Sequence, residues 1–491
     1  MKKMITDILK KLLIVLLIIS CNDAAYAQAD SIDVFVQSQM QKRRIPGLQL
    51  AIVRHGKIIK TGNYGLANVQ DSIPVSDKTV FTINSITKAF AGVAILQLVE
   101  AGKLKLNAPI SQYLPNIPEA WKPVTVQQLL SHTSGIPDIV DEEESVLIHD
   151  KPEVAWQQIL QMPNVFKAGE QFSYNQTNYL LLGRIIDTLS GMSFQEFISK
   201  EQLEKVGMIS TIRSGFGATK DIVPNAAAGY QYSKGKLNNM FFSFPPSLQT
   251  AAGMSSTAKE MAQWIIALQS MQLFKQPSSL TALWTPALLN NGRTGGFSRL
   301  LNGYAAGWPV IGRAEHPAVA PVGGGRSALF VYPNDDLSII VLTNLSGGSP
   351  DVFIDELAGL FIPDMKEANG FGLSPSLKLL KHALDKMGYK NAISEVKSMG
   401  KKQKQFELNE GEINGWGYKL ISQRRIQDAL EIFKLNVHLH PTSANAFDSL
   451  GEIYAELGEA ELAIKNYTQS LKLDPQNQHA AAEIQRLSAT K

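Results

Sequence analysis

The residues of this sequence best placed to do chemistry are a serine and a lysine three positions apart, Ser85 and Lys88. The run SITKAFAGVAILQLVE predicts a helix over residues 85–100 that ends before Gly102. At this spacing the hydroxyl and the amine share one helix face, within hydrogen-bond reach. A serine hydroxyl is a poor nucleophile until an adjacent base removes its proton, and N–H groups at a helix N-terminus favour a developing oxyanion. Ser85 and Lys88 are therefore a candidate nucleophile and base, although S-x-x-K also occurs by chance.

Further blocks along the chain give the pair a context. They are FTIN at 81–84, LLSHTSGI at 129–136, FSY at 172–174 with YLLLG at 179–183, AGMSST at 252–257 and VLTN at 341–344. In this order and spacing, they resemble the blocks of the β-lactamase-related serine hydrolases, which include class C β-lactamases, D-alanyl-D-alanine carboxypeptidases and related esterases. The resemblance covers residues 30–350.

The resemblance implies a role for each matching residue. Ser85 would be the acylated nucleophile, Lys88 its base, and Tyr174 a third member that shares the proton between nucleophile and leaving group. A base lysine must be neutral part of the time, so the pKa of Lys88 should lie below the free value of about 10.4. The oxyanion would be bound by the N–H of Ser85 and one N–H from the Gly323-Gly324-Gly325 segment. The histidine of the LLSHTSGI block is interpreted as structural.

The sequence departs from the family pattern in two substrate-binding positions. Gln176 stands where the family has an asparagine that binds the substrate amide, which keeps the chemistry but moves it by one methylene. The third motif, usually Lys or His, then Thr or Ser, then Gly, falls on Pro321-Val322-Gly323 and has lost its side-chain donor. His316 would replace that donor if the strand register were shifted, and Arg326 is a second candidate cation. For both, a surface residue at a strand start is an equal alternative.

The elements around these motifs predict an α/β fold of the layered α+β kind, an antiparallel sheet flanked by helices, β-lactamase/transpeptidase-like. Residues 47–53 and 57–63 are apolar-rich runs around His55-Gly56, and residues 327–332 and 337–345 flank the turn PNDD. Hairpins at both ends of the domain, with helical patterns between, indicate one sheet closed by the two hairpins. We expect this hydrolase domain to span residues 30–365.

A second region follows, with a repeat of 34 residues. Gly417, Ala429, Phe433 and Pro441 recur as Gly451, Ala463, Tyr467 and Pro475. Period and residue types resemble the tetratricopeptide repeat, a pair of antiparallel helices. We expect an all-α array over 411–491 with a capping helix at 480–487, preceded by a degenerate repeat over 375–410. A helical cap on the main domain is favoured slightly over a groove that docks a protein partner.

The first 27 residues read as a signal peptide. Lysines precede the apolar run LLIVLLIIS, and Ala25-Tyr26-Ala27 offers a cleavage site, which predicts an exported, periplasmic or secreted protein. The sequence IISC at 18–21 resembles a lipobox, so lipidation of Cys21 and membrane anchoring is an equal alternative. Because Cys21 is the single cysteine, the folded protein is expected to have no disulfide and no thiolate metal site.

Composition limits the remaining functions. A hydrophobic content of 44% excludes a disordered chain, and a net charge of +3 argues against a nucleic-acid partner. We expect an exported serine hydrolase that forms an acyl-enzyme without metal or cofactor. Its substrate would be a small-molecule ester or a D-amino-acid peptide of the peptidoglycan type, with β-lactams ranked last. The alternative is a catalytically eroded binding or sensor protein whose repeats recruit a partner.

Overall fold

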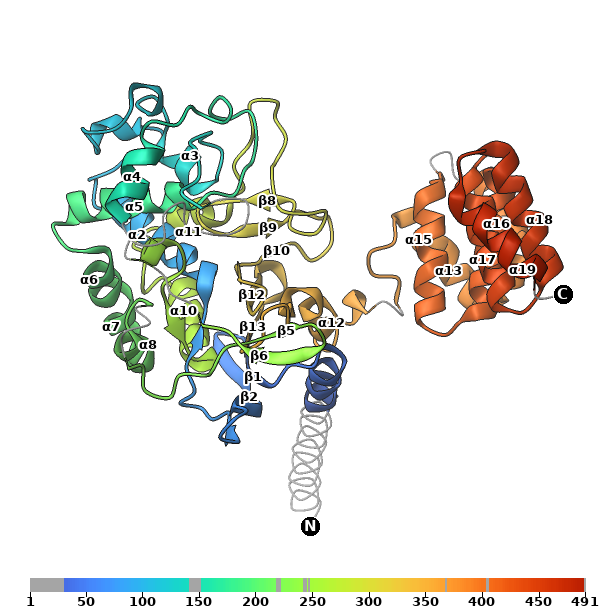
Figure 1. The fold of residues 1–491 in the computed structure, drawn as a ribbon, viewed down its shortest axis with the longest axis horizontal. Helices are drawn as coiled ribbons and strands as arrows, with labels where there is room; N and C mark the ends of the chain where they lie inside the picture. The colour runs from blue at the N-terminus through green and yellow to red at the C-terminus, as the bar shows by residue number, and fades with distance from the viewer. Residues whose placement is uncertain are drawn as a thin grey trace, which may run out of the picture. The chain divides into compact units, whose positions relative to one another are not determined.

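The structure is a computed structural model that describes residues 31–140, 152–217, 222–241, 245, 248–366, 369–402 and 406–489. The predicted signal peptide, with Cys21, lies outside the described residues. The chain forms two compact units, one up to Ile362 and one from Pro363 onward (Figure 1).

An antiparallel sheet organises the first unit. Within the described residues it has nine strands, in the order β3-β2-β1-β13-β12-β10-β9-β8, with β11 paired to β12. The two predicted hairpins meet at its centre, because Leu50 pairs with Gly62 on one side and with Val341 on the other. The prediction of an antiparallel sheet closed by the terminal hairpins is confirmed. The strands of the sheet are β1 (Gly47–Arg54), β2 (Lys57–Asn68), β3 (Ile73–Pro74), β8 (Gly303–Tyr304), β9 (Pro309–Ile311), β10 (Ala318–Val319), β11 (Val322–Gly323), β12 (Ser327–Tyr332) and β13 (Leu337–Thr343).

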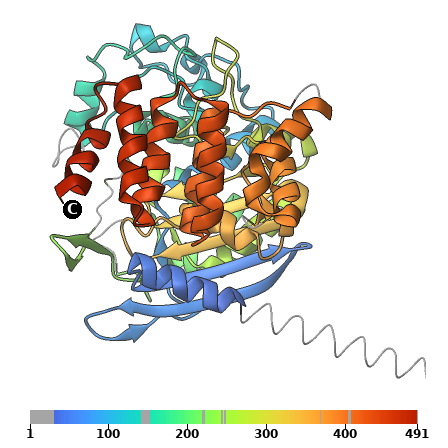
Figure 2. The ribbon, with the colours of Figure 1, turned by 90° about the vertical axis from the view of Figure 1, so that its right-hand side faces the viewer.

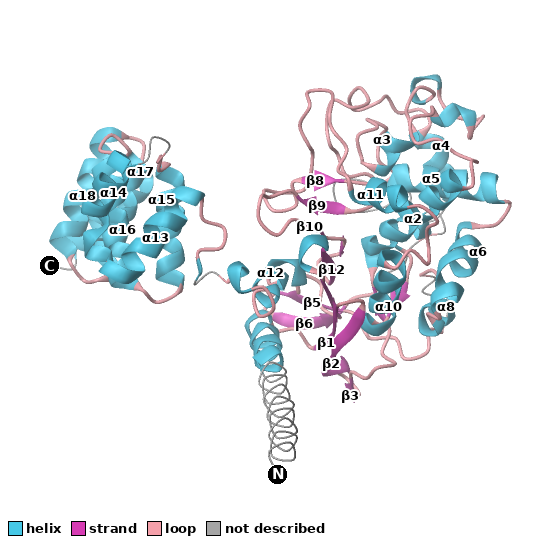
Figure 3. Cartoon of the chain, turned by 180° about the vertical axis from the view of Figure 1, so that it is seen from behind, coloured by secondary structure: helices cyan, strands magenta, loops and turns pink. Residues whose placement is uncertain are grey.

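The centre of this sheet is covered on both faces. Every residue of β12 and β13 is buried, and so is all of β1 except Arg54. Helix α10 (Ala258–Gln269) lies on one side and α12 (Ile354–Ala358) on the other (Figures 1 and 3). The N-terminal helix of residues 31–43 (Figure 2) packs beside the start of α12, where the ring centres of Phe35 and Phe353 are 6.3 Å apart. Burial on both faces explains why these strands are continuous apolar runs.

The helical part of the unit surrounds α2 (Thr87–Glu100), which is apolar on all sides and almost wholly buried. The predicted helix over 85–100 is confirmed from Thr87 onward, whereas Asn84–Ile86 form a 3₁₀ turn. Asn84, directly before the predicted start, has a left-handed φ of 47°, so the chain enters through the 3₁₀ turn and the regular α-helix begins two residues later than predicted. The other helices are α3 (Val126–Leu130), α4 (Pro152–Ile159), α5 (Gln176–Ser190), α6 (Phe194–Ile198), α7 (Glu204–Val206), α8 (Ile209–Ser214), α9 (Gln249–Ala252) and α11 (Pro277–Trp284).

Two small sheets of two strands each complete the described part of the unit. Strand β4 (Phe81–Thr82) pairs with β7 (Ser255–Ser256), and β5 (Tyr230–Ser233) pairs with β6 (Lys236–Asn239). The first of these joins the segment before Ser85 to the segment after α9. Two blocks of the predicted motif pattern are thereby held side by side.

The second unit consists of helices throughout its described part (Figure 3). The repeated residues occupy equivalent places, since Gly417 packs against the ring of Phe433 and Gly451 against the ring of Tyr467. The predicted helical C-terminal region is confirmed, and its assignment to the tetratricopeptide repeat stays a prediction. Its helices are α13 (Pro375–Met387), α14 (Ala392–Lys402), α15 (Glu410–Ser422), α16 (Ile426–Leu439), α17 (Ala444–Glu456), α18 (Ala460–Leu473) and α19 (Gln478–Ala489).

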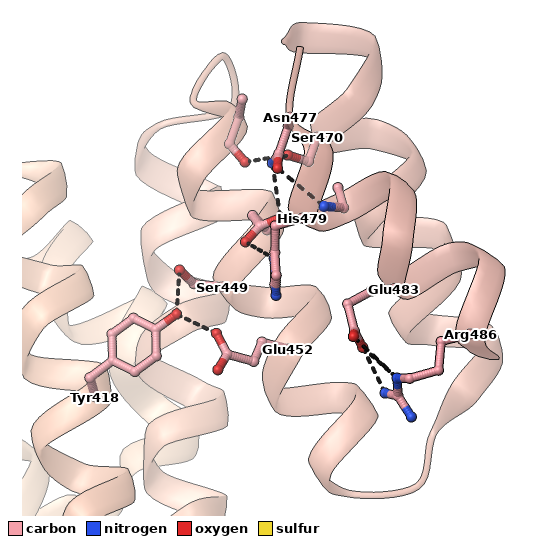
Figure 4. A network of polar contacts seen from close by, with 11 residues as sticks. Tyr418, Ser449, Glu452, Ser470, Asn477, His479, Glu483 and Arg486 are labelled. Atoms are coloured by element: carbon pink, nitrogen blue, oxygen red, sulfur yellow. Dashed lines mark hydrogen bonds and ion pairs between the residues drawn. The ribbon is translucent and has the colours of Figure 1, made fainter. Parts of the chain in front are cut away.

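Polar contacts connect α15, α17 and α19 (Figure 4). The Tyr418 hydroxyl donates to Glu452 at 2.6 Å and lies 3.1 Å from Ser449, and His479 Nδ1 lies 3.0 Å from an oxygen of Asp448. Successive repeats are therefore joined by hydrogen bonds as well as by apolar packing. In neither unit does a described helix have both the length and the apolar character to cross a bilayer.

Candidate active site

Ser85 and Lys88 lie together where the 3₁₀ turn passes into α2. The Lys88 Nζ is 3.3 Å from the Ser85 Oγ, as the spacing predicts. The ammonium also donates to the Gln176 Oε1 at 2.8 Å and to the Ala251 carbonyl oxygen at 2.9 Å. Residues from three separate elements, α2, α5 and α9, thus converge on one nitrogen.

The amine of Lys88 is in an environment that favours its neutral form. Its side chain is fully buried, and this burial lowers its pKa to about 7, although the carboxylate of Asp138 acts in the opposite direction. The rings of Tyr174 and Tyr179 lie 4.7 Å and 5.2 Å from the Nζ. At neutral pH a substantial fraction of Lys88 can therefore accept a proton from Ser85.

The ring of Tyr174 lies beside the Lys88 amine, two residues before the start of α5. Its ring is 4.4 Å from the imidazole of His132, centre to centre, and it remains partly exposed. The structure therefore brings Ser85, Lys88 and Tyr174 into one site.

Two side chains fix the segment that carries Tyr174. One is His132, interpreted as structural from its sequence block, and the other is Asp138, to which the sequence did not point. The Asn175 N–H donates to the Nδ1 of His132 at 3.1 Å, and the Gln176 N–H donates to the Oδ1 of Asp138 at 2.8 Å. Burial and the Lys88 charge hold the pKa of His132 well below its ordinary value, so the ring is neutral and accepts at Nδ1. Burial raises the pKa of Asp138, against the effect of its N–H partners.

A signal for Asp138 was present in the sequence. The residue stands among Ile136, Pro137, Ile139 and Val140, and a carboxylate in an apolar stretch must find hydrogen-bond donors when it is buried. Its donors are the N–H groups of Gln176 and Thr177 at the start of α5, where a negative charge is also favoured by the helix dipole, and the N–H of Val140.

The Gly323-Gly324-Gly325 segment meets the backbone just before Ser85. A Cβ atom at Gly323 would lie 2.1 Å from the Ile83 carbonyl oxygen, and one at Gly324 would lie 2.6 Å from the Asn84 Nδ2. Gly324 and Gly325 also have φ values of 54° and 60°, which glycine adopts without strain. These glycines permit a close approach that other residues would block, and they place this strand end beside Ser85.

The structure separates the two candidate replacements for the third-motif donor. β11 keeps the register in which Gly323 pairs with Ser327, and the Ser327 hydroxyl donates to Ile83 beside the site. His316 lies 2.8 Å from Asp335, which follows the far end of β12, so the length of that strand (roughly 16 Å) separates it from the glycines. The register shift that His316 requires is not observed, and the structure does not bring this residue to Ser85.

Arg326 is closer in the chain but is held elsewhere. Its side chain is buried, the Nη2 lies 3.0 Å from the Met240 sulfur, and burial lowers its pKa to about 10. The guanidinium therefore packs against the residue that directly follows β6. Gln176, in contrast, is at the site, although its amide oxygen is bound to Lys88.

Comparison with known proteins bears on this arrangement. The family model described as Beta-lactamase matches residues 32–362. The chain belongs to the beta-lactamase family. The match covers the whole sheet and the helices around Ser85, and it ends where the second unit begins. A beta-lactamase fold of this family is typical of serine hydrolases, and the converging Ser85, Lys88 and Tyr174 agree with that chemistry.

Individual relatives in the beta-lactamase family share this first unit. Protein flp of Staphylococcus aureus (strain COL) is 30% identical over 329 residues, 64% of this chain and 63% of that protein. A putative penicillin-binding protein PbpX of Bacillus subtilis (strain 168) is 30% identical over 236 residues, 48% of this chain and 58% of that protein. The chain thus matches less than two thirds of the length of these relatives. The octameric penicillin-binding protein homologue from Pyrococcus abyssi superposes with a TM-score of 0.60 at 27% identity, covering 72% of this chain and 81% of that one.

Proposed function

We propose that the protein is a serine hydrolase that cleaves small esters through an acyl-enzyme, with D-amino-acid peptides as a second substrate class and β-lactams last. The observation that carries the proposal is the buried Lys88 amine, which lies 3.3 Å from the Ser85 Oγ and has a pKa of about 7. A buried base with a pKa near the working pH is what a serine nucleophile needs.

The proposed reaction has two steps. Neutral Lys88 takes the hydroxyl proton as Ser85 Oγ attacks the carbonyl carbon, and the N–H groups of Ser85 and the Gly323-Gly324-Gly325 segment bind the oxyanion. Lys88 then gives up this proton through the Tyr174 hydroxyl to the leaving oxygen as the scissile bond breaks, which leaves the acyl group on Ser85 and Lys88 neutral again. Water then attacks the acyl-enzyme with the same base, releasing the acid and restoring the hydroxyl.

The ranking of substrates follows from the third motif. Val322 offers neither ammonium nor hydroxyl where related enzymes bind the carboxylate of β-lactams and D-alanyl peptides, and Arg326 is directed to Met240. Burying a carboxylate without a partner is costly. Esters that lack this carboxylate escape the cost and have a better leaving group than an amide.

Hydrolysis of three probes tests this ranking. We expect kcat/KM for p-nitrophenyl butyrate to exceed that for nitrocefin and for a D-Ala-D-Ala peptide by at least tenfold, with all turnover lost in Ser85→Ala. The names of two relatives refer to penicillin binding. A β-lactam, nitrocefin, is therefore one of the probes, and a better kcat/KM for nitrocefin than for the ester would contradict the ranking.

The eroded third motif also supports a second candidate, a binding or sensor protein. In that case a fluorophosphonate probe would not label Ser85, whereas the hydrolase must form the adduct. The repeats would then act as the partner-binding part, and the resemblance to the tetratricopeptide repeat supports that role.

Export belongs to the same proposal. The lysines and apolar run of residues 1–27 support a signal peptide. Mass spectrometry of the mature N-terminus distinguishes cleavage after Ala27 from lipidation at Cys21.

A further inference from the structure

The loop between α11 and β8 presents one aromatic side chain, Phe297, beside the candidate site. The loop is closely packed on its inner side, because a Cβ atom at Gly295 would lie 2.4 Å from the Phe172 Cβ. Its tip is closed by hydrogen bonds from the Ser298 N–H to the Leu301 carbonyl and from the Leu301 N–H to the Ser298 hydroxyl, at 3.2 Å and 3.1 Å. The backbone on both sides of Phe297 is therefore fixed.

The Phe297 ring is in contact with the rings of the site. Its centre lies 4.9 Å from that of Tyr174, 5.5 Å from Phe172 and 5.8 Å from Tyr304. These separations are typical of favourable aromatic pairs. Tyr304 is wholly buried, but 42% of Phe297 is exposed. Phe297 therefore adds an apolar surface, open to solvent, to the side of the site where Tyr174 lies.

The position of this surface determines which part of a substrate it meets. In the proposed reaction Tyr174 gives its proton to the leaving oxygen, so that oxygen must come within hydrogen-bond distance of the Tyr174 hydroxyl. A group attached to the leaving oxygen then meets an exposed ring that packs on Tyr174. The imidazole of His132, 4.4 Å from the Tyr174 ring, is buried, whereas the Phe297 ring, at 4.9 Å, is partly exposed.

We propose that Phe297 is a specificity-determining residue that, together with the ring of Tyr174, binds an aromatic or bulky apolar group on the alcohol side of the ester. This inference rests on the proposed hydrolase function and deepens it by naming the substrate class: esters of benzylic or similarly apolar alcohols. An aromatic contact of this kind is worth on the order of tenfold in discrimination.

Benzyl acetate and methyl acetate test the inference, because both esters pass through the same acetyl-enzyme and their alcohols are of similar acidity. The full-length protein is expected to prefer benzyl acetate, as the ratio of the two kcat/KM values shows. Phe297→Ala should lower this ratio about tenfold, mainly through KM. Phe297→Leu keeps an apolar side chain without the ring, and should give an intermediate ratio even if the alanine variant does not fold.

Leu288→Ala is the matched control, because Leu288 lies in the same loop and is 64% exposed, but its side chain carries no aromatic ring. Its ratio should equal that of the unmodified protein. Equal kcat/KM for the two esters, a ratio unchanged in the folded Phe297 variants, or the same loss in Leu288→Ala would overturn the inference alone. Failure of the unmodified protein to hydrolyse either ester would overturn the proposed function, and this inference with it.

Discussion

Protonation of Lys88 determines the pH range in which Ser85 can be activated. Burial lowers the pKa of the amine from 10.5 to about 7, and only the neutral amine accepts a proton. We therefore expect kcat/KM for p-nitrophenyl butyrate to rise with pH through about 7 and to level off above it. Stopped-flow assays from pH 5 to 9 measure this. A kcat/KM that still rises tenfold per pH unit at pH 9 would show that burial does not lower the pKa of Lys88, and Lys88→Ala should remove the limb with the activity.

Asp138, which accepts from the Gln176 N–H at the start of α5, also influences the titration of Lys88. Its negative charge favours the ammonium form of Lys88, so removing that charge lowers the pKa of Lys88 further. Asp138→Asn keeps an oxygen that can accept from the Gln176 N–H, and it should shift the acid limb of the pH profile to lower pH. The control is Glu196→Gln, in an exposed pair with Lys200, which should leave the limb in place. A shift to higher pH would contradict the assignment.

The backbone of Asn84, directly before Ser85, is in the left-handed region with a φ of 47°, which is strained for most residues. Asparagine tolerates this region better than alanine, and glycine adopts it freely. Asn84→Ala should therefore unfold at a lower temperature than Asn84→Gly, with a difference in unfolding free energy of about 1 kcal/mol. Thermal scans of the hydrolase transition measure the order of the two variants. Equal stability of the two would mean that the turn relaxes.

Some residues of the candidate site can be predicted from the sequence, and others can be identified only in the structure. Ser85, Lys88 and Tyr174 are brought together as expected because their types and spacing carry the motif. The chemistry of His316 makes it a candidate for the third-motif donor, but the observed register of β11 leaves this residue away from Ser85. No short sequence pattern reveals that register. Tertiary packing alone brings three further groups to the site: Asp138, Phe297 and the Ala251 carbonyl. A backbone carbonyl is present in every residue, so no residue type in the sequence can indicate it.

At the scale of elements, the two repeated glycines set the distance between paired helices. A Cβ atom at Gly417 would lie 2.6 Å from the buried ring of Phe433, so Gly417→Ala should cost about 1–3 kcal/mol through overpacking. Gly415 lies in the same helix with nothing within 4 Å of such an atom, and Gly415→Ala should be neutral or stabilising by up to about 1 kcal/mol. Circular dichroism of the full chain during urea unfolding measures both. A harmless Gly417→Ala would refute the close approach.

Long elements were predictable and short ones were not. The strands β12 and β13 appear as continuous apolar runs, and both hairpins have their turns where the sequence placed them. Strands β8 and β10 have two residues each, too few for any periodicity. The start of α2 differs from the prediction for a local reason, the backbone of Asn84.

At the scale of the whole molecule, each unit has its own apolar core, with one core built around α2 and another from α13 to α17. We therefore expect a chain that ends at Ser374 to fold and to keep the proposed esterase activity. Gel filtration, thermal unfolding and kcat/KM against the full chain measure this. An insoluble or inactive fragment would show that the helical unit is required by the hydrolase unit.

The pairing of β1 with β13 has a consequence for biosynthesis. Gly47 donates to the side chain of Asn344, which follows it by 297 residues, so the centre of the sheet joins the two ends of the unit. A ribosome that adds about 5–20 residues per second needs roughly 15–60 s to cover that interval. During this time β1 has only β2 as a strand partner, and its other edge and its apolar faces have nothing to pack against. The nascent chain must therefore be kept from aggregating by factors outside it, so overproduction should depend on chaperone supply more than on the stability of the finished fold.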